Sequence, residues 1–168
     1  LQGTGGNGTN NNAGVYLGAS SLQTDTGLIQ ILGTGGGNGT GNGSVGVYSS
    51  GAAIETNSGA VLLQGASSGG VHGNMGVYLN AGRIDTVDGD ITLQGTGTGS
   101  GALNFGVRLE SGAQCASSGD GDITLTGTSG TGKNNNHGVI LAGGSLSANT
   151  GSILITGTGR GTVNSNYG

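Results

Sequence analysis

The sequence contains no proline, no tryptophan and a single cysteine, Cys115. One cysteine cannot form an intrachain disulfide or a thiolate zinc site. Charged residues make up 7% of the chain, and only four of them are basic: Arg83, Arg108, Lys133 and Arg160. Nucleic-acid binding needs a basic stripe, and a membrane span needs roughly 18 consecutive apolar residues. We therefore expect no nucleic-acid partner, no membrane span and no cofactor.

Glycine is the most abundant feature of the composition, with 43 of 168 residues. This share is about a quarter, against roughly 7% in ordinary proteins. Chains rich in glycine and poor in charge are often disordered because they bury little apolar surface. Here the apolar residues recur at fixed positions, and glycine does not occupy every third position as in collagen. The sequence therefore favours an ordered repeat.

A Gly-Val pair recurs through the chain at intervals of 32, 30, 30 and 32 residues, starting at Gly14 and ending at Gly138. The repeats are 14–45, 46–75, 76–105, 106–137 and 138–167, preceded by a partial repeat, 1–13. Self-similarity at this period indicates structural units that stack on their neighbours. We expect residues 1–168 to form a single solenoid segment.

The repeat 76–105 shows which secondary structure each unit forms. It contains three short segments in which apolar and polar residues alternate: one around Val77 and Leu79, one around Ile84, and one around Ile91 and Leu93. Period-2 alternation bounded by Gly, Asn and Asp is typical of strands, and no segment has a helical period. Strands this short are stable only if each pairs with its equivalent in the next repeat, about 4.8 Å away. The sequence therefore predicts an all-β fold, a parallel β-helix with three strands per turn and about five turns.

Aligning the repeats predicts columns of aliphatic side chains inside the coil. The expected third column contains Leu22, Ile54, Ile84 and Leu146 and is broken in the fourth repeat by Gln114. The other columns are Val15, Val47, Val77, Val107 and Val139; Leu17, Ser49, Leu79, Leu109 and Leu141; Ile29, Val61, Ile91, Ile123 and Ile153; and Ile31, Leu63, Leu93, Leu125 and Ile155. Recurring glycines before the third strand, such as Gly59 and Gly89, are expected to adopt positive φ at a corner.

Three tyrosines, Tyr16, Tyr48 and Tyr78, occupy an outward column one turn apart. Such a stripe either stabilises the ladder through contacts between like neighbours or binds sugar rings or a partner surface. It is the candidate ligand-binding site of the chain. The first interpretation is the simpler one.

Polar loops offer several further candidates. Stretches of asparagine suggest stacked amides along a ladder, while Asn7, Asn38 and Asn42 match the glycosylation acceptor pattern, which composition alone also generates. The acidic residues Asp85, Asp88, Asp90, Asp120 and Asp122 are better explained as turn caps than as a calcium site, because the calcium-binding Gly-Gly-x-Gly-x-Asp repeat is absent. No metal site is expected.

Catalytic residues are not evident. Glu55 and Asp85 fall in one outward column, but two carboxylates without a further acid or base make a poor polysaccharide-cleaving site. His72 and His137 lie 65 residues apart with no matching acid or nucleophile, and His137 is expected to be partly buried. Cys115 is expected to be a small, partly buried residue. We expect no enzymatic activity.

A threonine column raises the question of an ice-binding face. Thr34, Thr96, Thr128 and Thr158 share one outward column, which Ala66 interrupts. No second threonine column is expected beside it, so the pattern supports this function weakly.

The consensus G-V-Y-L-x-x-G-x-I-x-T-x-x-G-x-I-x-L-x-G-T-G, carried best by residues 76–97, resembles repeats in giant bacterial surface proteins of the filamentous-haemagglutinin-like, β-helical adhesin type. The resemblance covers the whole chain and rests on composition and period. It implies a secreted, extracellular or cell-surface protein that acts in adhesion or as a fibre.

Neither end of the sequence resembles the polar cap that a solenoid needs, and the chain does not begin with methionine. We therefore expect part of a longer rod, or copies that join end to end. The favoured function is a structural shaft of an extracellular bacterial fibre or adhesin. The alternatives are a carbohydrate-binding adhesin face and, less favoured, a polysaccharide-degrading β-helix enzyme.

Overall fold

The computed structural model describes residues 1–168 and contains 16 β-strands and no helix. The strands form three parallel sheets. Sheet A consists of β1 (Gln2–Thr4), β4 (Ile29–Thr34), β7 (Val61–Ala66), β10 (Ile91–Thr96), β13 (Ile123–Thr128) and β16 (Ile153–Thr158). Sheet B consists of β2 (Ala13–Gly18), β5 (Val45–Ser50), β8 (Met75–Asn80), β11 (Phe105–Glu110) and β14 (Val139–Ala142). Sheet C consists of β3 (Ser21–Thr24), β6 (Ala53–Thr56), β9 (Arg83–Thr86), β12 (Gln114–Ser117) and β15 (Ser145–Ala148).

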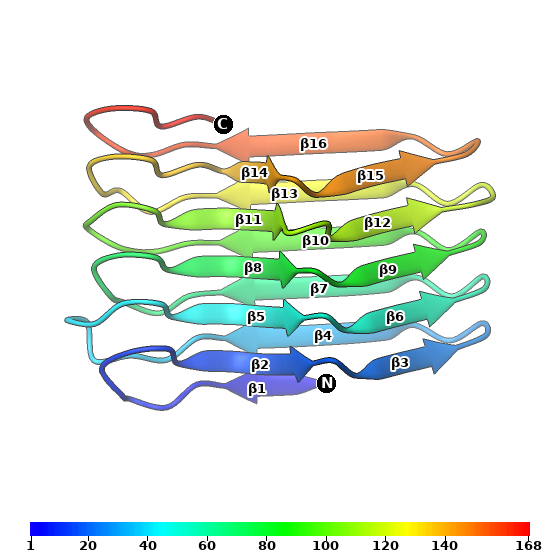
Figure 1. The fold of residues 1–168 in the computed structure, drawn as a ribbon, viewed down its shortest axis with the longest axis horizontal. Coiled ribbons are helices and arrows are strands. Elements are labelled where there is room, and N and C mark those ends of the chain that lie inside the picture. Colours follow the sequence, from blue (N-terminus) through cyan, green and yellow to red (C-terminus); the bar gives the residue numbers. More distant parts are fainter.

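Each turn of the chain adds one strand to each sheet, as the sequence predicts. Sheets B and C follow one another across one face of the coil, and the strands of sheet A return in the opposite direction on the other face (Figure 1). Every strand pairs in parallel with its equivalent in the next turn, so that Ile91 lies beside Val61 on one side and Ile123 on the other. The fold is a parallel β-solenoid.

The interior consists of the predicted aliphatic columns. Val77, Ile91 and Leu93 have no solvent exposure, and 18 buried residues form one continuous hydrophobic cluster. Because each turn alone has almost no core, this cluster exists only through the stacking of turns. A second, smaller cluster of Val45, Met75 and Phe105 lies beside the tyrosine column.

The fourth repeat does not break the third column at Gln114. Cys115 pairs with Ile84 and Leu146 and is fully buried, whereas Gln114 is exposed. The alignment was wrong by one residue because the two extra residues of this repeat are divided between the turn before β12 and the corner after it. Cys115 is therefore a core residue, not a partly buried one.

The corner glycines are required by close packing and not by positive φ. Gly59 and Gly89 have ordinary negative φ values, but a Cβ on Gly89 would overlap the carbonyl oxygen of Gly59 in the preceding turn. Gly121 and Gly151 continue the same column with the same contact. Stacked turns approach so closely at this corner that no side chain fits between them.

The last turn leaves core positions uncovered. Leu141, Ile153 and Ile155 are 39%, 44% and 46% exposed, whereas their equivalents one turn earlier have no exposure. The outer edge of β16 also has no paired strand. This end of the structure presents apolar side chains together with unpaired backbone hydrogen-bonding groups.

Candidate functional site

The three tyrosines of the candidate site form a ladder along sheet B. Tyr48 and Tyr78 stack nearly parallel, with ring centroids 4.8 Å apart and an interplanar angle of 4°. Tyr16 is tilted by 50° against Tyr48, with centroids 5.3 Å apart. The spacing equals the distance between adjacent strands, so the ladder follows directly from the parallel pairing of β2, β5 and β8.

Stacking determines which part of each ring a ligand could reach. Both faces of Tyr48 are covered by its neighbours, and the guanidinium of Arg108 lies 5.5 Å from the centroid of Tyr78, over its ring. Only Tyr16, which is 61% exposed, has a free face. The ladder therefore offers ring edges and hydroxyl groups along most of its length.

A groove of about 640 Å³ runs beside the ladder and is mainly apolar. Its lining includes the tyrosines together with Asn11, Ala13, Val45, Met75 and two glycines. Six of its nine lining residues are hydrophobic.

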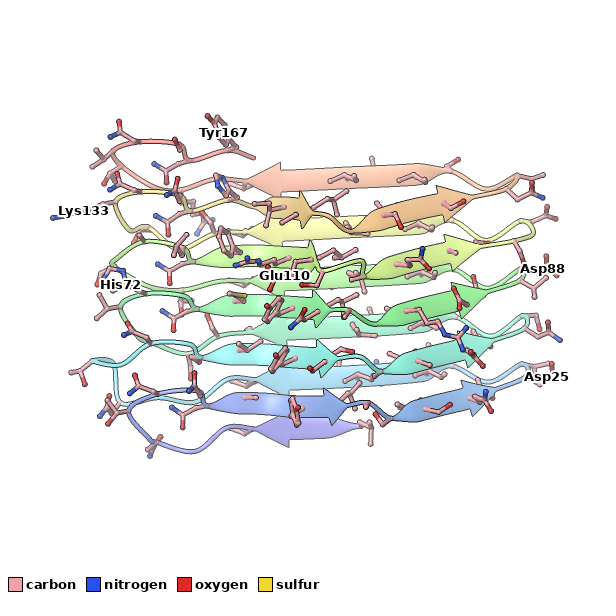
Figure 2. The ribbon with its side chains drawn as sticks, viewed as in Figure 1. Asp25, His72, Asp88, Glu110, Lys133 and Tyr167 are labelled. Atoms are coloured by element: carbon pink, nitrogen blue, oxygen red, sulfur yellow. The ribbon has the colours of Figure 1, made fainter.

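A charged group closes the tyrosine ladder on the side of β11. Tyr78 donates a hydrogen bond from its hydroxyl to the carboxylate of Glu110, which also forms an ion pair with Arg108. Both charged side chains are largely covered, at 24% and 18% exposure. Burial raises the pKa of the Glu110 carboxyl and lowers the pKa of the Arg108 guanidinium. Figure 2 shows Glu110 near the middle of the view, between the loops at either side.

Buried asparagines form a second ladder, in the long loops before sheet B. Asn74, Asn104 and Asn136 have no solvent exposure. The Oδ1 atom of Asn104 accepts hydrogen bonds from the backbone N–H of Asn74 at 3.0 Å and from its side-chain amide at 2.8 Å. Asn104 donates in turn to Oδ1 of Asn136. These side chains satisfy the loop backbone and leave no polar atom for a ligand.

The exposed acceptor asparagines of the glycosylation pattern lie at the surface of the same loops. Asn7, Asn38 and Asn42 are all exposed. Oδ1 of Asn42 accepts a hydrogen bond from the backbone of His72. Exposure fits the acceptor pattern, which the composition of these loops also generates.

The acidic residues lie at the opposite corner, between sheets C and A, where Figure 2 labels Asp25 and Asp88. Oδ1 of Asp90 accepts the backbone N–H of Asp122 at 2.9 Å, and Asp122 does the same for Ser152 at 2.6 Å. Each carboxylate thus caps the next turn. No group of three or more His, Cys, Asp or Glu side chains converges as a metal site requires.

A basic side chain from the neighbouring outward column reaches Glu55 and Asp85, a contact that the column alignment does not predict. Arg83 forms ion pairs with Glu55 in the preceding turn and with Asp85, 2.7 Å away in its own strand. Gln23 donates to the free end of Glu55. The guanidinium therefore offsets one of the two carboxylate charges, and the group lies on an open surface.

The two histidines occupy different environments, and neither lies near a carboxylate or nucleophile. His137 is 9% exposed and is stacked between Phe105 and Tyr167, with centroids 5.5 Å and 5.2 Å away. Its Nδ1 accepts the backbone N–H of Tyr167 at 3.2 Å. Nδ1 of His72 accepts a loop N–H from Ala102 at 2.8 Å. Both imidazoles serve as ladder elements.

The outward face of sheet A carries more threonines than expected. Thr92 pairs with Thr124, and Thr126 pairs with Thr156, beside the column of Thr96, Thr128 and Thr158. Gln94 and Leu154 interrupt these two neighbouring columns, so each contributes a pair of threonines and neither is a complete second column. A trough of about 480 Å³ runs along this face from β1 to β13, and Gly33, Gly65 and Gly95 form its floor. One wall is the column of Leu32, Gln64, Gln94 and Thr126, and the other is the column of Thr34, Ala66, Thr96 and Thr128.

The architecture assigns the chain to the class of parallel β-solenoids. No known family matches the sequence, and no curated protein or solved structure is significantly similar to it. The structure contains no helix that is long and apolar enough to cross a membrane.

Proposed function

We propose that the chain is a structural shaft of an extracellular bacterial fibre or adhesin and that its turns continue into further turns by parallel β-pairing. The observation that carries the proposal is the interface between turns, which repeats along the coil: inward side chains such as Leu93 and Leu125 are buried against the turns on either side. Full burial of such a side chain stabilises by about 2 kcal/mol. The three parallel ladders add backbone hydrogen bonds between neighbouring turns along the whole coil.

The remaining surface supports a mechanical role. Arg83 and Arg108 are paired with carboxylates, Asp90 caps a turn, and Asn104 donates a hydrogen bond to the neighbouring asparagine of its ladder. The proposed function requires no catalysis. Rods of this kind extend by repeating one interface, because every turn offers the same ladder to the next.

Sedimentation velocity and electron microscopy of three proteins test this function. The wild-type chain is expected to form rods that lengthen with concentration. Ile155→Asp, which places a charge on the inward face of β16, is expected to stay monomeric. Leu154→Asp is the matched control, because Leu154 is already 58% exposed and its neighbour in β13, Thr124, lies on the outward face. A wild-type chain that stays monomeric at high concentration contradicts the proposal.

A second candidate is a carbohydrate-binding adhesin face along Tyr16, Tyr48 and Tyr78. The apolar groove beside the ladder favours it, because sugar-binding sites combine aromatic surfaces with a few polar groups. The free face of Tyr16 is the strongest contact point. Glycan-array binding that Tyr16→Ala abolishes would support this candidate, and absence of glycan binding by the wild type would remove it.

A further inference from the structure

The outward face of sheet A differs from the rest of the surface because it carries no ionisable side chain in any of its six strands. The outward positions are Gln2 and Thr4; Gln30, Leu32 and Thr34; Leu62, Gln64 and Ala66; Thr92, Gln94 and Thr96; Thr124, Thr126 and Thr128; and Leu154, Thr156 and Thr158. Sheets B and C carry the arginines and carboxylates described above. A face without charges favours an uncharged partner, because a charged partner would lose its hydration on binding without gaining an ion pair.

Threonines are concentrated in the last three strands of this face. Seven of the nine outward positions of β10, β13 and β16 are threonine, and all are at least partly exposed. The three strands pair residue for residue without a bulge, so the side chains lie on a regular grid. Neighbouring threonines are about 4.8 Å apart between strands and about 6.7 Å apart along a strand.

The hydroxyl groups of this grid are not used by the protein. Some threonines elsewhere donate hydrogen bonds to protein atoms: Thr56 to Asp25, Thr98 to Ser67 and Thr150 to Gly119. None of the seven threonines of the grid makes a side-chain hydrogen bond to the protein. Their β-branched side chains have few rotamers, so an ordered array costs little entropy to fix.

The trough between the two columns sets the size of what can enter it. Two columns about 6.7 Å apart leave a free width of roughly 3 Å once a carbon contact distance of about 3.7 Å is subtracted. This width accepts a single file of water molecules and is too narrow for a sugar ring. The trough reaches the grid at Thr96, Thr126 and Thr128, where Gly95 forms its floor.

We propose that the threonine grid of β10, β13 and β16 is an ice-binding surface. Oxygen atoms in a prism plane of hexagonal ice repeat in two perpendicular directions at spacings of the same size as those of the grid. The hydroxyls and a file of water in the trough continue that lattice, while the threonine methyl groups pack into the gaps between its waters. This activity is independent of the proposed shaft function, because it uses one side of the coil and not its end.

Incorporation into a slowly growing ice hemisphere tests the proposal with three proteins. The wild-type chain is expected to enter the ice. Thr126→Tyr places a bulky ring at the centre of the grid. We expect this variant to need at least about a tenfold higher concentration than the wild type for the same effect on ice growth, because loss of a central contact weakens a flat interface by about this factor. Gln30→Tyr is the matched control on the same face outside the grid and is expected to behave as wild type.

The outcomes separate ice from other neutral ligands. Far-UV circular dichroism establishes that each variant keeps its β-structure. Exclusion of the wild type from ice overturns the proposal, as does an equal loss with Gln30→Tyr. Binding to a neutral glucan, or dimerisation, that Thr126→Tyr abolishes while wild-type chains stay out of ice would assign the face to that partner and also overturn it.

Discussion

The carbonyl oxygen of Gly106 in β11 occupies the space that a Cβ atom on Gly95 in β10 would fill. Gly65 and Gly76 have the same relationship one turn earlier, and Gly127 and Gly138 one turn later. Sheets A and B therefore touch backbone to backbone along a line parallel to the rod axis. This contact explains why the glycine of each Gly-Val pair and the glycine near the end of each third strand recur together.

Gly95→Ala is expected to destabilise the coil strongly, because the added methyl group meets rigid backbone and not a mobile side chain. We expect a loss of about 3 kcal/mol or more, the upper range for overpacking a core. Thermal unfolding followed by circular dichroism measures it. Gly6→Ala is the control, since nothing lies within 4 Å of its added Cβ. Equal melting temperatures for the two variants would contradict the backbone contact.

Asn104→Ala is expected to lower the free energy of unfolding by roughly 2 to 4 kcal/mol. The substitution leaves two N–H groups of Asn74 without their acceptor and removes the hydrogen bond that Asn104 donates to Oδ1 of Asn136. Asn149→Ala removes an exposed side chain with no hydrogen bond and is expected to change the stability little. Urea unfolding of both variants measures the difference. Similar midpoints would show that the asparagine ladder contributes little to stability.

The stability of the chain is expected to fall in mild acid because of His137. Burial lowers the pKa of its imidazole below the usual value of 6.5. The unfolded chain therefore takes up a proton more readily than the folded one, so stability is greatest above about pH 6.5 and declines as the pH falls through that value towards the folded pKa. His137→Phe keeps the aromatic stack and should weaken this decline. Urea midpoints measured between pH 5 and 8 test it, and identical profiles for both proteins would refute it.

Cys115 is expected to be chemically inert in the folded chain. Burial, with a further contribution from the charge of Asp85, raises the pKa of its thiol from 9.0 to about 12. A shift of this size lowers the thiolate fraction about a thousandfold at neutral pH, and the thiolate is the reactive form. Reaction with a thiol reagent should be slow in buffer and fast in denaturant. Rapid labelling of the native chain would place the thiol outside the core.

The repeat predicted most of the fold, because alternation and period together determine which residues face inward. The positions of Val77 and Ile91 in their columns were enough to predict that both side chains are buried. Two errors have local causes. The division of two extra residues within the fourth repeat shifted Cys115 by one position, and the corner glycines were attributed to positive φ because sequence does not show how closely two turns approach.

The candidate sites depended on relations across turns that the sequence leaves open. The tyrosine column was predicted, but the mutual covering of its faces depends on ring orientation. Arg83 reaches back to Glu55 because a long side chain spans the gap between strands, which a column alignment does not represent. The threonine grid was missed because only one of its columns was followed through the repeats.

Electron cryomicroscopy of the assembled protein tests the shaft most directly. The account predicts filaments of uniform width in which parallel strands continue across every junction at a spacing of about 4.8 Å, with Ile153 and Ile155 buried beneath the next turn. Single coils of five turns at high concentration, with both residues still facing water, would contradict it.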